Sequence, residues 1–135
     1  MTPEVGLRLP DLVVTSTSRQ LVQYAAASRD FYEAHYDLGF ARSIGLPGVI
    51  LHGLFKLALF GRTVTSWAGP DCFLRELSAT YRGTDLVNEP FRVAATVVQA
   101  TTEEGLHVVT LELKGVSANG RESTFGKAVV DFATA

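Results

Sequence analysis

The sequence predicts an α+β fold in which an antiparallel sheet wraps around one central, buried helix. Residues 51–69 are apolar on almost the whole circumference of a helix, which is typical of a helix enclosed by other elements. The segments after it are rich in Val, Thr and Phe and alternate in polarity, as strands do. These segments are residues 73–83, 91–103, 106–118 and 123–135. One β-branched segment, residues 7–17, precedes the helix and predicts a fifth strand.

The region between the first strand and the buried helix predicts short helices and a loop. Ser18 is a good N-cap, and residues 19–28 carry apolar side chains at helical spacing. Residues 29–45 have room for one or two further helical turns. The sequence GLPG at 45–48 then predicts a loop, because Pro and Gly interrupt regular structure.

Turn signals separate the four later strands. These signals are TDLVNEP at 84–90, EEG at 103–105 and NGR at 119–121. The Asn119–Gly120 pair is the strongest single hairpin signal, because both residues tolerate the positive φ that tight hairpin turns require.

Length, charge and hydropathy limit the class of protein. A chain of 135 residues predicts one domain, residues 1–135. The net charge of −2 and the absence of a Lys/Arg cluster argue against nucleic acid or an anionic membrane as partner. The most apolar run, residues 49–60, is shorter than a membrane span and is interrupted by polar residues. With no signal-peptide pattern at the N-terminus and a single cysteine, Cys72, we expect a cytoplasmic protein.

Residues 24–53 contain the motif with the clearest chemical meaning. Asp30 and His35 lie five positions apart, and Ile-x-His-Gly follows at 50–53. The stretch resembles the signature of the MaoC-like (R)-specific enoyl-CoA hydratases. In that family, Tyr-Ala-x-x-Ser leads into Gly-Asp-x-Asn-Pro-x-His, and Ile-x-His-Gly closes the motif. The matching positions are Tyr24, Ser28, Asp30, His35, Asp37, Ala41, Gly45, Ile50, His52 and Gly53.

The resemblance implies a hotdog fold and a hydro-lyase that reversibly hydrates a trans-2-enoyl thioester to a (3R)-hydroxyacyl thioester. It assigns catalysis to Asp30 and His35, the oxyanion hole to Gly53, and substrate contacts to Tyr32 and His52. It implies no metal and no redox cofactor, because CoA or the phosphopantetheine of an acyl carrier protein is part of the substrate. The expected assembly is a homodimer, or a heteromer with a second hotdog chain.

The residue types suit this chemistry. Water is a poor nucleophile, and an Asp and a His on either side of one water molecule can act as general acid and base. As water attacks, the thioester oxygen becomes enolate-like, and the unpaired amides at a helix N-terminus stabilise such an oxygen. Gly53 lets the thioester approach closely, because it has no side chain.

Three departures from the family pattern leave alternatives open. Arg29 replaces the usual Gly, and Tyr32 and Glu33 replace Asn-Pro. Variants of this kind, with RDF at 29–31 and WAGP at 67–70, resemble actinobacterial members, some of which are linked to steroid side-chain acyl-CoA. The three departures also keep open a non-catalytic subunit of a heteromer. A hotdog thioesterase is the other alternative, although residues 51–69 carry no Asp or Glu to direct water at the thioester carbonyl.

Each motif residue also has a purely structural interpretation. Taken alone, Asp30 is a solvated charge or a cap, and His35 and His52 are packed histidines. The spacing of His35, His52 and His107 matches no common zinc pattern. Lys56 is a candidate for binding the phosphates of CoA, or an ordinary lysine with its ammonium group in water.

Overall fold

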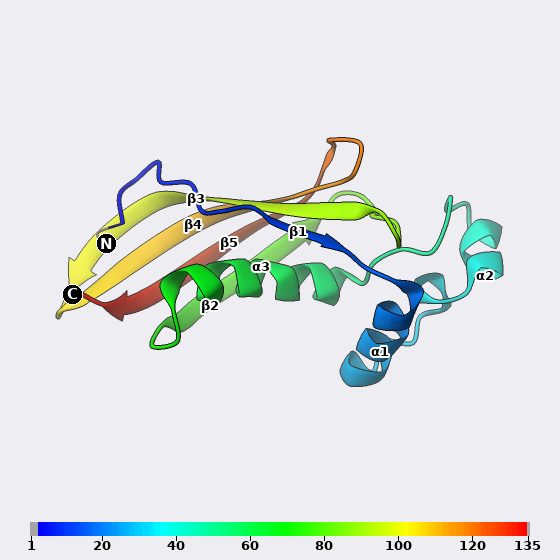
Figure 1. The fold of residues 1–135 in the computed structure, drawn as a ribbon, viewed down its shortest axis with the longest axis horizontal. Coiled ribbons are helices and arrows are strands. Elements are labelled where there is room, and N and C mark those ends of the chain that lie inside the picture. Colours follow the sequence, from blue (N-terminus) through cyan, green and yellow to red (C-terminus); the bar gives the residue numbers. More distant parts are fainter. Residues whose placement is uncertain (1–2, 135) are drawn as a thin grey trace.

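Five antiparallel strands form one curved sheet, and helix α3 (Gly53–Ala68) lies across one of its faces (Figure 1). The computed structural model describes residues 3–134. The strands are β1 (Leu12–Thr15), β2 (Phe73–Tyr81), β3 (Pro90–Glu103), β4 (Leu106–Val116) and β5 (Glu122–Ala133). Their order in the sheet is β1-β3-β4-β5-β2, so β1 and β2 are the two edges. The predicted α+β hotdog arrangement is therefore confirmed.

The buried side of α3 forms the core with the inward faces of the strands. Leu59, Phe60 and Val64 of the helix are buried against the sheet. Phe60 can lie this close because Gly126 of β5 has no side chain, and a Cβ there would lie 2.6 Å from the Phe60 ring. The strands contribute a larger buried set: Phe91, Val93, Ala95, Val97, Val109, Leu111, Leu113, Ala128 and Val130.

The expectation that α3 is enclosed on all faces is only partly correct. Leu54, Ala58 and Arg62 form an exposed stripe along the helix, because the sheet covers only one side of it in the single chain. Lys56 and Thr63, in contrast, are buried. The sequence pattern misassigned these positions, since it assumed that apolar residues would be inside and charged residues outside.

The predicted first strand is shorter than expected. Only residues Leu12–Thr15 pair continuously with β3, whereas Arg8 forms an isolated bridge with Thr96. Pro10 lies between these two segments, and a proline has no N–H to donate to a neighbouring strand.

Three helical segments lie between β1 and α3, at one end of the sheet (Figure 1). They are α1 (Ser18–Ser28), the 3₁₀ turn η1 (Glu33–His35) and α2 (Leu38–Ser43), so the predicted short turns are confirmed. The N-cap of α1 is Thr17 and not Ser18 as predicted. The Thr17 hydroxyl accepts from the Gln20 amide, and the Gln20 side chain accepts from the Thr17 amide, which forms a capping box.

Two hairpin turns connect the long strands. Glu104 and Gly105, with φ of 49° and 79°, form a two-residue turn between β3 and β4. The predicted turn at Asn119–Gly120 is also present and lies in the longer connection between β4 and β5. The sequence thus identified both connections, but the shorter one is at Glu104–Gly105.

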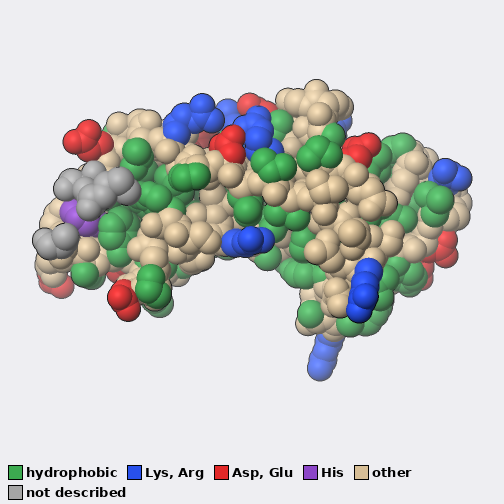
Figure 2. Space-filling model, in the orientation of Figure 1, with side chains coloured by type: hydrophobic (Ala, Val, Ile, Leu, Met, Phe, Trp, Pro, Cys, Tyr) green, Lys and Arg blue, Asp and Glu red, His purple; other side chains and the backbone are tan. Residues whose placement is uncertain are grey.

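The surface carries no large area of one charge on the face that Figure 2 shows. Lys and Arg side chains lie singly or next to Asp and Glu, and the surface is hollowed along its lower edge between α3 and α1 (Figure 2). Within residues 3–134, no helix combines the length and the apolar character needed to span a membrane.

Candidate active site

Asp30 reaches the site because α1 ends abruptly just before it. Arg29 is the C-cap of α1 and has left-handed φ and ψ of 59° and 26°, the conformation in which helices usually place Gly. The Asp30 amide then donates to the Ala25 carbonyl at 3.1 Å. This geometry explains why the family motif has Gly at the position of Arg29.

The two predicted catalytic side chains lie together. His35, in η1, is buried, whereas Asp30 is partly exposed. The distance from Asp30 Oδ2 to His35 Nε2 is 3.7 Å. This is too long for a direct hydrogen bond, but a water molecule beside the pair can lie at ordinary hydrogen-bond distance from both atoms.

The second nitrogen of His35 fixes which form of the ring is present. Nδ1 lies 2.9 Å from the Ile50 carbonyl oxygen, which can only accept a hydrogen bond. Nδ1 therefore carries the proton in the neutral ring, and Nε2 presents its lone pair towards Asp30. His35 is thus oriented to accept a proton from a water molecule at Nε2.

His52 lies behind His35 and has no access to solvent. The two rings are stacked, and the edge of the Tyr24 ring packs against His52 with centroids 5.1 Å apart. Burial, and to a smaller extent the neighbouring His35, lower the pKa of His52, while Asp30 acts in the opposite direction. This position supports the ring of His35 and does not form part of a pocket wall.

A pocket of about 250 Å³ opens next to the Asp30–His35 pair. Its lining includes His35, Gly53, Tyr32 and Tyr81. Gly53 is the first residue of α3, so its N–H has no acceptor within the helix. A Cβ at Gly53 would lie 3.1 Å from the Tyr81 ring, which leaves little space for a side chain at this position.

Tyr32 forms part of the pocket wall. Its ring packs edge-on against His35 and Phe40, with centroids 5.8 and 5.6 Å apart. The side chain is about half exposed, and its backbone amide lies 3.4 Å from Asp30 Oδ1. Tyr32 thus occupies the side of the site where the family motif has Asn.

Three further residues lie at or near the pocket: Tyr81 and Asp85 were not predicted as site residues, and Lys56 was predicted only as a candidate for binding the phosphates of CoA. Tyr81 and Lys56 line the pocket, and Asp85 forms an ion pair with Lys56. Burial, and secondarily Tyr24, raise the pKa of Tyr81. One signal in the sequence was a lone lysine within the apolar helical run. For Asp85, the sequence TDLVNEP at 84–90 predicts only a turn.

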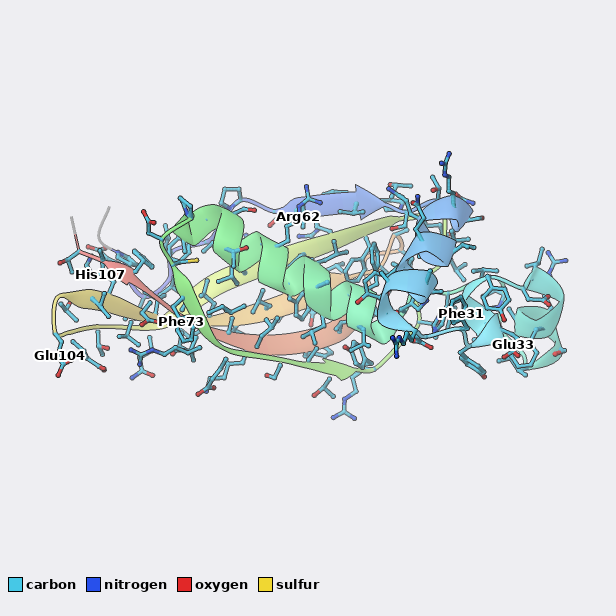
Figure 3. All side chains as sticks on the ribbon, turned by 90° about the horizontal axis from the view of Figure 1, so that it is seen from below. Phe31, Glu33, Arg62, Phe73, Glu104 and His107 are labelled. Carbon is cyan, nitrogen blue, oxygen red and sulfur yellow. The ribbon has the colours of Figure 1, made fainter. Side chains whose placement is uncertain are left out.

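The cluster has enough donor atoms to raise the question of a metal. Ligand atoms of Asp30, His35 and His52 lie within 4.8 Å of one another. The planes of the stacked imidazoles, however, are only 24° apart, so lone pairs that lie in these planes do not converge on one nearby ion, which is a poor arrangement for two ligands of one tetrahedral site. His107 lies at the opposite end of the molecule from Phe31 and Glu33, far from this cluster (Figure 3).

Comparison with known proteins identifies a matching domain family and a related sequence. The chain matches the MaoC like domain over residues 6–118. It is 33% identical over 73 residues to the 3-oxo-4,17-pregnadiene-20-carboxyl-CoA hydratase beta subunit of Mycobacterium tuberculosis (strain ATCC 25618 / H37Rv). That match covers 54% of this chain and 57% of the relative.

Two solved structures illustrate the similarity in fold. The ChsH1-ChsH2 complex from Mycobacterium tuberculosis contains a chain with a TM-score of 0.84 and 23% identity, covering 96% of this chain and 98% of that one. The (R)-hydratase from A. caviae involved in PHA biosynthesis has a TM-score of 0.86 and 23% identity, covering 94% and 95%. At these identities the structures support the fold, and the domain match adds the family. The chain therefore belongs to the MaoC-like dehydratase family.

Proposed function

We propose that this chain catalyses the reversible hydration of a trans-2-enoyl thioester, carried by CoA or acyl carrier protein, to the (3R)-hydroxyacyl thioester. The observation that carries the proposal is the 3.7 Å gap between Asp30 Oδ2 and His35 Nε2 beside a pocket lined by Gly53. One water molecule beside the pair can bind to both atoms, and the Gly53 amide, which has no acceptor within its helix, is available for the thioester oxygen.

In the first step the bound water attacks C3. A water molecule that donates to both His35 Nε2 and Asp30 Oδ2 keeps its oxygen lone pairs free for the substrate. As the C3–O bond forms, one water proton passes to this pair of side chains, and general base help of this kind contributes about 10²–10⁴-fold in rate. The Ile50 carbonyl holds the His35 ring in the required orientation.

The same step moves electrons towards the thioester. The π electrons of the C2=C3 bond form a C1=C2 bond, and the carbonyl electrons move onto the oxygen. The N–H of Gly53 and the positive end of the α3 dipole stabilise this enolate. A proton from the Asp30–His35 pair then reaches C2, so that one water molecule has been added overall and the enzyme is unchanged.

The direct test is hydration of crotonyl-CoA and of longer and bulkier enoyl-CoAs by the purified protein, followed by loss of the conjugated absorbance. Chiral analysis of the product should give the (3R) isomer. Release of free thiol with no formation of the hydroxyacyl product would instead indicate a thioesterase.

We infer that the active form is an assembly of two hotdog chains. The relative in Mycobacterium tuberculosis is named a beta subunit, and one similar structure is a complex of two different chains. In this chain Phe31, Tyr36 and Leu54 are apolar and exposed, and β2 forms a free edge of the sheet. Both features favour burial against a second chain.

Measurement of mass in solution distinguishes the assemblies. A homodimer that hydrates enoyl-CoA needs no other chain. A monomer that is inactive until a second hotdog chain is added indicates a heteromer. In the heteromer, loss of activity on substitution of Asp30 would place catalysis in this subunit, and unchanged activity would make it the non-catalytic one.

The name of the relative also supports a bulky acyl group as substrate. A steroid side-chain enoyl-CoA should then be hydrated with a higher kcat/KM than crotonyl-CoA. The reverse preference would favour a short linear acyl chain.

A further inference from the structure

A charged pair is buried beside the proposed oxyanion site. Lys56 and Asp85 are only 3% and 5% exposed, and Lys56 Nζ lies 2.9 Å from Asp85 Oδ2. Nζ also donates to the Gly83 carbonyl at 3.1 Å. Burial of an ion pair costs several kcal/mol of desolvation per ion, so such a pair contributes little to stability compared with apolar residues of the same size. Stability alone therefore does not explain why the Lys56–Asp85 pair is present.

Asp85 is held in place by more than the lysine. The Ser117 hydroxyl donates to Oδ1 at 2.5 Å, and the Ser123 hydroxyl donates to Oδ2 at 2.6 Å. The carboxylate is thus fixed by hydroxyl groups on two further parts of the chain. The position of its partner, the Lys56 ammonium, is fixed in consequence.

The positively charged member of the pair is the one that lines the substrate pocket. Lys56 lines the pocket of His35 and Gly53, whereas Asp85 lines a separate cavity together with Ser117. Side chains of a helix point towards its N-terminus, so Lys56 carries its ammonium back towards the level of Gly53, one turn earlier.

Gly53 and Lys56 both lie next to the ring of Tyr81, which places them on one side of the pocket. A Cβ at Gly53 would lie 3.1 Å from the Tyr81 ring, and Lys56 Nζ lies 5.5 Å from the centroid of that ring. Among residues 3–134, Gly83 and Asp85 provide the two hydrogen-bond acceptors of Nζ. An ammonium has three donors, so one N–H is left for a ligand.

A cation in this position opposes the local electrostatics of the helix. Positive charge near the N-terminus of a helix is unfavourable, because the helix dipole is positive there. Residues that oppose a local preference of this kind are often found at functional sites. An oxyanion bound at the Gly53 amide would convert this unfavourable arrangement into a favourable one.

We propose that Lys56, held by Asp85, is a further residue of the site and stabilises the enolate oxygen together with the Gly53 N–H. This inference rests on the proposed hydration reaction. As the C2=C3 electrons move towards the thioester, negative charge develops on its oxygen, and the fixed ammonium attracts that charge. Because the Lys56 side chain is buried, the attraction is stronger than it would be in water.

The test compares Lys56→Met, which keeps the length of the side chain and removes its charge, with the wild-type protein. The active assembly is used, with its second chain if one is required. We expect kcat to fall by about 10²-fold, as for loss of one oxyanion donor, while KM changes much less. Lys114→Met is the control, because Lys114 is exposed and pairs with Glu122 on the surface.

Two additions separate an electrostatic role from a structural one. Lys56→Met alone leaves Asp85 buried without its partner, so the double variant Lys56→Met/Asp85→Asn provides a neutral and better-folded comparison. In an Asp30→Asn background, which prevents turnover, the absorption of a bound aromatic enoyl-CoA reports polarisation of its carbonyl. A shift to longer wavelength in the Asp30→Asn protein that is lost when Lys56 is also replaced supports the proposal.

Other outcomes overturn it. If the wild-type protein hydrates enoyl-CoA and the double variant does so at a similar rate, Lys56 has no part in the reaction. If kcat falls but the absorption shift persists, Lys56 only maintains the fold near the pocket. If the wild-type assembly hydrates no enoyl thioester, the proposed function itself fails, which is a distinct result.

Discussion

The imidazole ring of His52 stacks on that of His35, with ring centroids 3.9 Å apart and planes 24° from parallel. His52 is fully buried, and within residues 3–134 neither of its nitrogens has a hydrogen-bond partner of good geometry. Burial and the adjacent His35 keep the pKa of His52 below its usual value, so His52 remains neutral. A neutral ring supports the flat face of His35 without adding a charge to the site.

The stability of the protein should therefore decrease on mild acidification. The unfolded chain protonates His52 near the ordinary pKa of 6.5, whereas the folded chain resists protonation to lower pH. The unfolded state then binds more protons, so the free energy of unfolding falls as pH drops below about 6.5. Chemical denaturation between pH 7 and 5 should show a smaller loss for His52→Phe than for wild type. His107→Phe is the control, and equal losses for His52→Phe and wild type would contradict the assignment.

Arg29→Gly should stabilise the protein. Arg29 has the left-handed φ of 59°, and a residue with a Cβ costs about 1–2 kcal/mol there, partly offset by the greater entropy of Gly in the unfolded chain. We expect a net gain of about 0.5–1 kcal/mol in the free energy of unfolding. Arg29→Ala keeps the Cβ and should show no such gain. An unchanged or lower stability of Arg29→Gly would mean that the Arg29 side chain makes a compensating contribution.

Gly53→Ala should reduce activity more than it reduces stability. The added methyl group would lie 3.1 Å from the Tyr81 ring and would occupy the space that the thioester needs. A misplacement of the reacting groups by about 1 Å can cost about 10²-fold in rate, and we expect a loss of that order in kcat/KM. Gly39→Ala in α2, with a similarly tight contact of 3.3 Å to Asp37, is the matched control. Full activity of Gly53→Ala would argue against close approach of the substrate at this position.

Removal of metal ions should leave the hydration rate unchanged. The stacked rings of His35 and His52 do not direct their lone pairs to one point, and the proposed steps use only side chains and a backbone amide. Dialysis against a chelator followed by the enoyl-CoA assay checks this expectation. Activity that is lost on dialysis and restored by Zn²⁺ would show that Asp30, His35 and His52 act as metal ligands.

The fold was predicted from local patterns of polarity, and the Asp30–His35 pair from the resemblance of one short motif to a known family. The apolar run 51–69 identified α3, and alternating segments identified the later strands. Asp30 and His35 lie on one short segment, so their proximity depends on one helix end and one 3₁₀ turn. Features that depend on residues close together in the sequence can be predicted from it, because few contacts with distant segments alter them.

The residues that were missed depend on contacts between distant parts of the chain. Lys56 and Asp85 are 29 positions apart, and their burial becomes visible only when α3 and the loop after β2 are placed together. Sequence alone suggested that Lys56 would have its charge in water, which is the usual position of a lysine. The exposed stripe of α3 was missed for a similar reason, because the curvature of the sheet decides which helix face it covers.

The most direct measurement of the central claim is the turnover of enoyl-CoA by Asp30→Asn and His35→Ala, each compared with the wild-type assembly. Each variant should lower kcat by about 10²–10⁴-fold, because each removes one of the two groups that bind and deprotonate the water. Circular dichroism and thermal unfolding of both variants are the controls that check whether they are folded. Turnover close to that of the wild type in both variants would show that the water is activated elsewhere.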